Sequence, residues 1–342
     1  MRVSFDVIRI SCALPFVFVA ATAAAHHSPG AYDITAEATI EGTVTEFHWT
    51  NPHVYIYVKE DSNDGEATIW EIEAFAPTIM RQSGWSADTL AAGDHVVALV
   101  RPPRKSGSNA AWLASIENSD ETLLDREIPE SSPAYGDDNS QARTDSLSGV
   151  WEGRGGDAVT LLLYLPRTLP LTEKGIQAMD NFQSATMNPG IDCVPFTAPL
   201  YMVLPGFKKI EISDDVVLIR GEDADVERVV HMNVASHDGA ALMIQGHSIG
   251  SWEGDVLVVD TARFASHSLG IGADLASGTG KRIVERFQLA ADGSSLTYGF
   301  ELEDPEYLTA PVTGTSEWVY RPDVEFTPAE CDIDSARRFI DD

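Results

Sequence analysis

The sequence predicts a mainly β protein built from two β-barrel domains, and three observations support this prediction. Apolar and polar residues alternate over short segments along most of the chain, as they do in half-buried strands. Turn-forming residues separate these segments at short intervals, as in antiparallel barrels and sandwiches. An aperiodic stretch rich in Asp, Glu, Ser and Pro, residues 119–146, divides the pattern in two and predicts an exposed acidic linker.

Residues 1–25 predict a secretory signal peptide. Arg2 and Arg9 form a basic start, and the apolar run that follows ends in the small residues ATAAA before His26. The run is too short to span a bilayer comfortably, and no later segment reaches the ~18 apolar residues that a spanning helix needs. We therefore expect a periplasmic or secreted protein without membrane insertion.

The N-terminal domain, residues 26–118, is expected to be a five-stranded OB-like small β-barrel. A short helical segment at residues 76–83 separates three predicted strands from two more. The strands are predicted over residues 38–49, 53–60, 66–75, 95–101 and 110–117. This β-β-β-α-β-β order is that of an OB-type barrel, although other small barrels also fit it.

The charge of the chain argues against one partner that such barrels often have. OB-type barrels commonly bind oligonucleotides. This chain has 53 Asp and Glu residues against 23 Lys and Arg, and its formal net charge is −30. A chain so acidic repels the phosphate backbone, so we expect no nucleic-acid partner and attribute the acidity to solubility.

The mature N-terminus predicts a copper-capable chelate. Signal peptidase requires small residues before the cut, so cleavage after residue 23, 24 or 25 fits the sequence. The last of these exposes His26 beside a free amine, and the other two place His26 or His27 third from it, which suits Cu(II). His48 and His53 lie near one strand break and could add a ligand. The alternative is that both are ordinary barrel residues and that the terminus is only a polar start.

Three segments of the N-terminal half carry a family resemblance: AHHSPGAYD, TIEGTVTEFHWTNPHVYIYV and GWSADTLAAGDHV. Together they resemble a family of uncharacterised exported bacterial domains, over residues 25–118. The resemblance implies an exported small β-domain and brings no activity with it. The family pattern of Ala-His-His-Ser and Thr-Asn-Pro-His singles out five residues here: His26, His27, Asn51, Pro52 and His53.

The C-terminal domain, residues 147–342, is expected to be a larger antiparallel β-barrel or sandwich with one helix. Glu253-Gly254-Asp255 predicts the turn of a central hairpin, and the apolar run at 256–259 predicts a strand covered on both faces. The helix is predicted over residues 172–184, where Thr172 can cap it. Further strands are predicted over residues 209–213, 216–222, 226–233, 246–252, 282–290, 296–302 and 317–320.

The C-terminal half carries a second resemblance, in GHSIGSWEGDVLVVDTARF and VERFQLAADGSSLTYGFELEDPEYLTAP. These segments resemble another uncharacterised exported bacterial family, over residues 147–332, with no known reaction. That family usually has an Asp-Gly-Arg-x-His-Pro segment before the Gly-His-Ser core and a Pro-His-Ser segment after it. Here the corresponding positions are His237-Asp238-Gly239 and Ala276-Ser277-Gly278, so those histidines are lost or moved.

Two cysteines remain after the signal peptide, Cys193 and Cys331. An even pair in an exported chain favours one disulfide bond, because the compartment is oxidising. We expect this bond to tie the C-terminal segment to the loop before the strand at 209–213.

Candidates for chemistry in the C-terminal domain are judged by residue type and by strand alternation. His247 is one, but its neighbour Ser248 points to the opposite face of the strand, so no Ser-His dyad is expected. Glu285 and Arg286 also alternate, so only one of them faces inward, either to clamp an anionic ligand or to form a structural ion pair. Aromatic residues could line a pocket for an apolar ligand or simply fill the core: Trp151, Trp252 and Phe287.

These observations lead to three functional hypotheses. The first is an exported binding protein of unknown ligand, with copper at the mature N-terminus and a small apolar molecule in the C-terminal barrel. The second is an enzyme (a lyase, isomerase or hydrolase) in that barrel, acting through His247 and an inward carboxylate. The third is a structural envelope protein with neither site.

Overall fold

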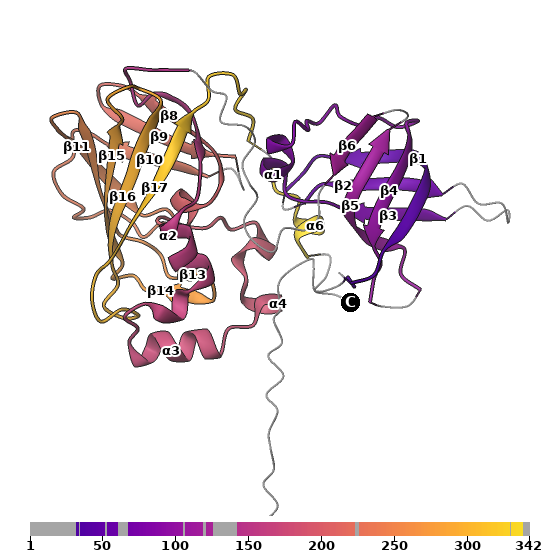
Figure 1. The fold of residues 1–342 in the computed structure, drawn as a ribbon. Helices are drawn as coiled ribbons and strands as arrows, with labels where there is room; N and C mark the ends of the chain where they lie inside the picture. Colours follow the sequence, from indigo (N-terminus) through magenta and orange to yellow (C-terminus); the bar gives the residue numbers. More distant parts are fainter. Residues whose placement is uncertain are drawn as a thin grey trace, which may run out of the picture.

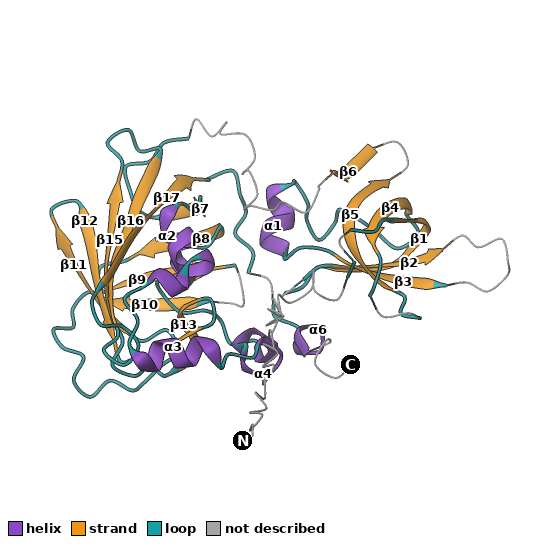
Figure 2. Cartoon of the chain, turned by 60° about the horizontal axis from the view of Figure 1, so that its bottom comes forward, coloured by secondary structure: helices purple, strands orange, loops and turns teal. Residues whose placement is uncertain are grey.

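The computed structural model describes residues 32–33, 35–51, 53–60, 68–104, 107–118, 121–125, 142–222, 226–328 and 330–337. Two β-barrels lie beside each other, and the C-terminal segment runs back from the larger barrel to the smaller one (Figures 1 and 2). The predicted signal peptide, residues 1–25, lies outside the described residues. His26 and His27, which follow it, also lie outside them. Among the described helices, none is long and apolar enough to cross a bilayer.

The N-terminal barrel is closed by five strands in the order β3-β2-β1-β4-β5, with β3 pairing parallel to β5. This arrangement confirms the predicted OB-like barrel, and the helix α1 (Pro77–Gln82) lies between β3 and β4 as expected. The strands are β1 (Ala38–His48), β2 (Tyr55–Glu60), β3 (Ile69–Glu73), β4 (His95–Arg101) and β5 (Ala110–Asn118).

Along β1, alternate side chains point into the barrel core. Ile40 and Val44 are buried there, against Val96, Ala98 and other strand residues. Between them stands Gly42, where a Cβ atom would lie 2.1 Å from the carbonyl oxygen of Lys59. Only glycine fits this close approach of the two strands.

The start of the predicted linker is a strand. β6 (Glu121–Asp125) pairs antiparallel with β5 and adds a sixth strand at the edge of the N-terminal sheet. The prediction placed residues 119–146 outside both domains because their composition is polar. The short sequence Thr122-Leu123-Leu124 is compatible with a strand, and β5 has a free edge to receive it.

The C-terminal domain is a closed barrel of nine strands, so the choice between barrel and sandwich is resolved in favour of the barrel. Its strands follow the order β10-β11-β12-β15-β16-β17-β7-β8-β9, and all pairings are antiparallel except that of β10 with β11. The strands are β7 (Gly149–Gly153), β8 (Gly206–Ile212), β9 (Val216–Gly221), β10 (Glu227–His231), β11 (His247–Glu253), β12 (Val256–Ala262), β15 (Arg282–Leu289), β16 (Ser295–Glu303) and β17 (Val312–Tyr320).

Short helices and a two-stranded ribbon fill the long connections of this barrel. The predicted helix is α3 (Glu173–Asp180), and the Thr172 side chain caps it by accepting a 3.0 Å bond from Gly175 N. The ribbon pairs β13 (His267–Gly272) with β14 (Leu275–Ser277). Other helical segments, of three to five residues, are too short to show a helical period in the sequence: α2 (Asp157–Val159), η2 (Thr160–Tyr164), η3 (Pro166–Thr168), α4 (Ser184–Met187), η4 (Pro189–Asp192), α5 (Leu200–Val203) and α6 (Ile333–Arg337).

Candidate functional site

A pocket of about 340 Å³ lies between the two barrels and is lined from both. The N-terminal barrel contributes Asn51, together with Ala76 and Ile79 at α1. The C-terminal domain contributes an apolar wall made of Val194, Pro195, Phe196, Leu204, Pro205 and Val226. Small-molecule sites are typically concave, mainly apolar and placed between domains, so this pocket has the form of one.

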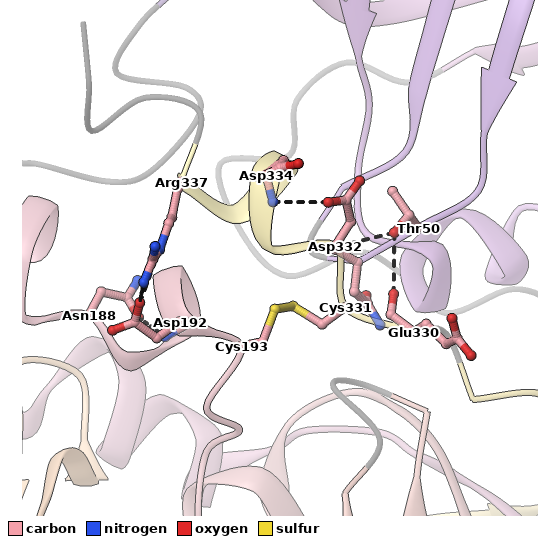
Figure 3. The surroundings of a disulfide bond; sticks show 11 residues. Thr50, Asn188, Asp192, Cys193, Glu330, Cys331, Asp332, Asp334 and Arg337 are labelled. Atoms are coloured by element: carbon pink, nitrogen blue, oxygen red, sulfur yellow. Dashed lines mark hydrogen bonds and ion pairs between the residues drawn. A yellow bond between two sulfur atoms is a disulfide. The ribbon is translucent and has the colours of Figure 1, made fainter.

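The disulfide bond between Cys193 and Cys331, drawn in Figure 3, forms part of the pocket lining. The two sulfur atoms are 2.04 Å apart and the two Cα atoms 5.8 Å apart, which confirms the predicted bond. It links the residue that follows η4 to a segment 138 residues later in the chain. The bond therefore holds one wall of the pocket to the C-terminal segment.

That segment, residues 330–337, is called here the C-terminal strap, and it binds the N-terminal barrel through its backbone (Figure 3). Asn51 N donates to the carbonyl oxygen of Glu330 at 3.2 Å, and Asp332 N donates to the carbonyl oxygen of Asn51 at 3.0 Å. The Thr50 hydroxyl donates to the same Glu330 oxygen at 3.2 Å. The strap is thus bonded to the N-terminal barrel by hydrogen bonds and to the C-terminal domain by the disulfide.

An ion pair also joins the two domains. Arg81 of α1 contacts the carboxylate of Glu222, whose side chain is fully buried just after β9. The same guanidinium donates to the carbonyl oxygen of Thr327 at 2.9 Å and lies 5.8 Å from the ring centre of Trp49. A buried carboxylate requires a partner of opposite charge, so this contact favours one relative placement of the two barrels.

In the N-terminal barrel, His53 lies in a buried polar group rather than on an open surface. Its Nδ1 atom is 2.6 Å from Oε1 of Glu73, and the Tyr32 hydroxyl donates to Oε2 of the same carboxylate at 2.7 Å. Trp112 packs edge-on against the His53 ring at 5.6 Å. Tyr32 belongs to the AHHSPGAYD segment of the sequence, and its hydroxyl shares this carboxylate with His53.

His48 does not share a site with His53. Its Nε2 atom is 2.9 Å from Glu46, and its ring lies 5.0 Å from that of Tyr57 on an exposed part of the barrel. Over the described residues, no group of three or more His, Cys, Asp or Glu side chains is arranged to hold a metal ion. His26 and His27, the other predicted copper ligands, lie outside those residues.

Glu285 faces the interior of the C-terminal barrel, and Arg286 faces outward, as alternation predicted. The inward partner of Glu285 is Arg228 of β10, whose two NH groups donate at 2.9 and 2.5 Å. The Tyr298 hydroxyl donates to the same carboxylate at 2.9 Å, and burial together with the Glu285 charge raises the pKa of Tyr298 well above its usual range. The arrangement is a fully buried ion pair that links three strands, and sequence reasoning missed Arg228 and Tyr298. The alternating pattern of β10 places Arg228 at an inward position, and this pattern could have identified it as the partner of an inward carboxylate.

A second buried polar group lies beneath the β13–β14 ribbon. Lys281 donates to the Thr197 hydroxyl at 2.7 Å, and burial lowers the pKa of its amine to about 7. His267 contacts the carbonyl oxygen of Pro195 at 3.1 Å; burial and the Lys281 charge lower the pKa of its imidazole to about 4. These groups join the connecting loops to the barrel wall.

The aromatic candidates do not line a common pocket, because two of them lie in the barrel core and the third lies outside it. Trp151 and Phe287 are fully buried in the packed core of the barrel, where Phe287 contacts Trp318 edge-on at 5.9 Å. Trp252 lies on the outer side of β11 and is 45% exposed. The pocket between the barrels contains none of these aromatic residues, and of its lining the sequence analysis had named only Asn51, Cys193 and Cys331.

His247 also lies on the outer side of the barrel, whereas its neighbour Ser248 is buried inside and contacts Thr261 at 2.8 Å. The Nδ1 atom of His247 is 2.9 Å from Nδ1 of His237. His247 and Glu285 therefore lie on opposite sides of the barrel wall. Arg286, on the outer side, pairs with Glu253 at 2.7 Å.

Comparisons with known proteins agree with the N-terminal resemblance. Residues 15–112 match the model of a family described as a family of unknown function, DUF6152. This match does not reach the C-terminal domain, whose resemblance stays a prediction. No curated protein matches the chain.

Among solved structures, the chain is similar to two crystal forms of the mitochondrial single-stranded DNA-binding protein Rim1 from S. cerevisiae. One match has 13% identity, covers 24% of this chain and 92% of that one, and has a TM-score of 0.21. The other has 14% identity, covers 28% and 98% respectively, and has a TM-score of 0.20. Such low TM-scores support no argument about function.

Proposed function

We propose that the protein is an exported binding protein that holds a small, mainly apolar molecule between its two barrels. The observation that carries this proposal is the apolar pocket of about 340 Å³ lined by both domains and by the Cys193–Cys331 disulfide. The sequence-based hypothesis put the ligand inside the C-terminal barrel. Trp151 and Phe287 fill that interior, so the proposal moves the ligand to the interface.

The lining suggests the chemistry of the ligand. Apolar side chains make up most of the wall, and Asn51 and Tyr201 supply the polar side chains in it. The volume is near the lower end of the range for drug-sized ligands. A ligand of one or two rings, neutral and with one hydrogen-bonding group, suits this lining.

The test fills the pocket and measures the binding of a neutral apolar probe, N-phenyl-1-naphthylamine, by its fluorescence. Val194→Trp places a large ring in the wall and is expected to reduce probe affinity at least tenfold. Val234→Trp makes the same change at a position 38% exposed and outside the pocket lining, so it should bind as the unchanged protein does. Equal affinity of both variants and the unchanged protein would remove the support for the pocket. Native mass spectrometry of protein from its own source then identifies what the pocket holds.

A second candidate function is copper binding at the mature N-terminus, and the surroundings of His53 favour it. The Glu73 carboxylate contacts Nδ1 of His53 at 2.6 Å, as carboxylates do behind metal-bound histidines. The Tyr32 hydroxyl donates to the same carboxylate. His26 and His27 are close to Tyr32 in the chain and so within reach of His53.

Copper affinity of the mature protein, measured beside a peptide of its first residues, tests this second candidate. A folded site requires tighter binding by the protein and a loss of that advantage in His53→Ala. The matched variant is His48→Ala, which removes an exposed histidine of the same barrel and should leave the affinity unchanged. If peptide and protein bind equally, the histidines are a chelating terminus to which the fold adds nothing.

The enzyme hypothesis receives less support from the geometry. His247 and Glu285 face opposite sides of the barrel wall, and both carboxylate oxygens of Glu285 already accept hydrogen bonds from Arg228 or Tyr298. A general acid or base must reach a substrate proton, and this carboxylate is fully buried.

A further inference from the structure

Three histidines meet on the outer side of the C-terminal barrel, apart from the pocket between the domains. His231 ends β10, His247 begins β11, and His237 lies in the connection between these strands. The rings of His231 and His247 are stacked at 5.2 Å, and the His237 ring lies edge-on to His247 at 5.1 Å. We propose that His237 and His247 bind a divalent transition-metal ion, Cu(II) or Zn(II), through their Nδ1 atoms.

The distance between the two nitrogens suits a shared metal ion. Metal–imidazole bonds are about 2.0–2.1 Å long, so two ligands at a right angle on one ion have nitrogens about 2.9 Å apart. The Nδ1 atoms of His237 and His247 are 2.9 Å apart. Without a metal, this contact requires one nitrogen to carry a proton and the other a lone pair. A metal ion that replaces the proton lies to one side of the line between the two nitrogens, so the separation of the nitrogens is kept while each ring turns towards the ion.

The surroundings orient His237 as metal ligands are usually oriented. Its Nε2 atom is buried, lies 3.7 Å from Oδ1 of Asp260 and makes no hydrogen bond in the part of the chain that the structure describes. Arg282 holds Asp260 with two bonds of 2.9 and 2.6 Å. A carboxylate behind the far nitrogen fixes the tautomer and makes the ligating nitrogen more basic.

The proposed site has two protein ligands, with water in the remaining positions. This is consistent with the finding that, in the described part of the chain, no group of three or more His, Cys, Asp or Glu side chains is arranged to hold a metal ion. Imidazole nitrogen suits copper and zinc, and among divalent first-row ions copper binds most tightly. His231 stacks on His247 and is placed to become a third ligand after a change of rotamer, although the proposal does not require it.

The test uses the mature protein with a short N-terminal extension, because blocking the terminal amine removes the chelate expected at His26 or His27. Cu(II) is titrated by calorimetry, and the bound ion is examined by electron paramagnetic resonance. We expect one ion per chain with nitrogen coupling from two imidazoles, and at least tenfold weaker binding in His237→Ala and His247→Ala. His95→Ala, which changes a histidine of the other barrel, is the matched control and should bind as the unchanged protein does.

Asp260→Asn separates a metal site from a chance surface contact. It keeps the shape of the side chain and removes the charge behind His237, so affinity should fall by about 10–100-fold. If the alanine variants do not fold, His247→Gln is tested in their place. Thermal unfolding without metal shows whether each variant is folded. The proposal is overturned if the extended protein binds no copper, or if the changes at residues 237 and 247 leave the affinity as it was.

Discussion

Replacing Arg228 by methionine should destabilise the C-terminal barrel by about 3–5 kcal/mol. Arg228 and Glu285 are both fully buried, and the guanidinium supplies two of the hydrogen bonds to the carboxylate, at 2.9 and 2.5 Å. In Arg228→Met only the 2.9 Å bond from Tyr298 remains, so folding must bury an uncompensated charge or protonate it. Removing one partner of a buried pair typically has an effect of this size.

Removing both charges should restore most of the lost stability. In Arg228→Met combined with Glu285→Leu, no charge is left unpaired, and apolar replacements of a buried pair are often neutral or stabilising. The Tyr298 hydroxyl loses its acceptor, which costs about 1–3 kcal/mol. The double variant is therefore expected to be more stable than Arg228→Met alone.

Urea unfolding at neutral pH measures these differences, with tryptophan fluorescence as the signal because Trp151 and Trp318 are buried in this barrel. The data are fitted with separate transitions for the two domains. Arg286→Met is the matched control, since its partner Glu253 and Arg286 itself are both more than half exposed, and such pairs contribute about 0–1 kcal/mol. If Arg228→Met unfolds like Arg286→Met, the reasoning about the buried pair is wrong.

Three further predictions concern other parts of the molecule. Replacing Cys193 and Cys331 together by serine should lower the free energy of unfolding by up to about 5 kcal/mol, because the bond closes a loop of 138 residues. Adding reductant to the unchanged protein should have the same effect, and an unchanged free energy of unfolding would contradict this prediction. Burial and the Lys281 charge lower the pKa of His267 to about 4. The stability that the protein gains from keeping this imidazole neutral is therefore complete above pH ~6.5 and is lost as pH falls towards 4, by about 3 kcal/mol at most. His267→Gln should flatten this part of the profile of stability against pH, and an unchanged slope would refute the assignment. Limited proteolysis should cut the predicted linker within residues 131–141 and leave two folded pieces that stay associated through the strap, whereas degradation without stable fragments would mean one shared core.

Much of the fold could be predicted because strand formation leaves a local pattern. Alternation located β4 at its observed residues and most other strands of both barrels within a few positions, but the predicted strand at 317–320 covers only the second half of β17, and no strand was predicted over β7. It also predicted that Glu285 and Arg286 face opposite sides. The disulfide followed from having only two cysteines in the expected mature chain. β6 and the short helices were missed because three to five residues carry too little periodicity.

The candidate sites depended on contacts between distant parts of the chain, which alternation does not encode. Alternation places Glu285 inside the barrel, but only the strand order shows that Arg228, 57 residues earlier, is its partner. The pocket exists because α1 of one barrel and the loop at Cys193 of the other come together under the strap. Likewise, His237 meets His247 only because the connection from β10 folds back onto β11. The sequence by itself determined the two barrels, the inward faces and the cysteine pair, since each follows from local backbone geometry or from composition. Tertiary structure decided which charges, rings and walls face one another, because those distances are set by packing between segments far apart in the chain.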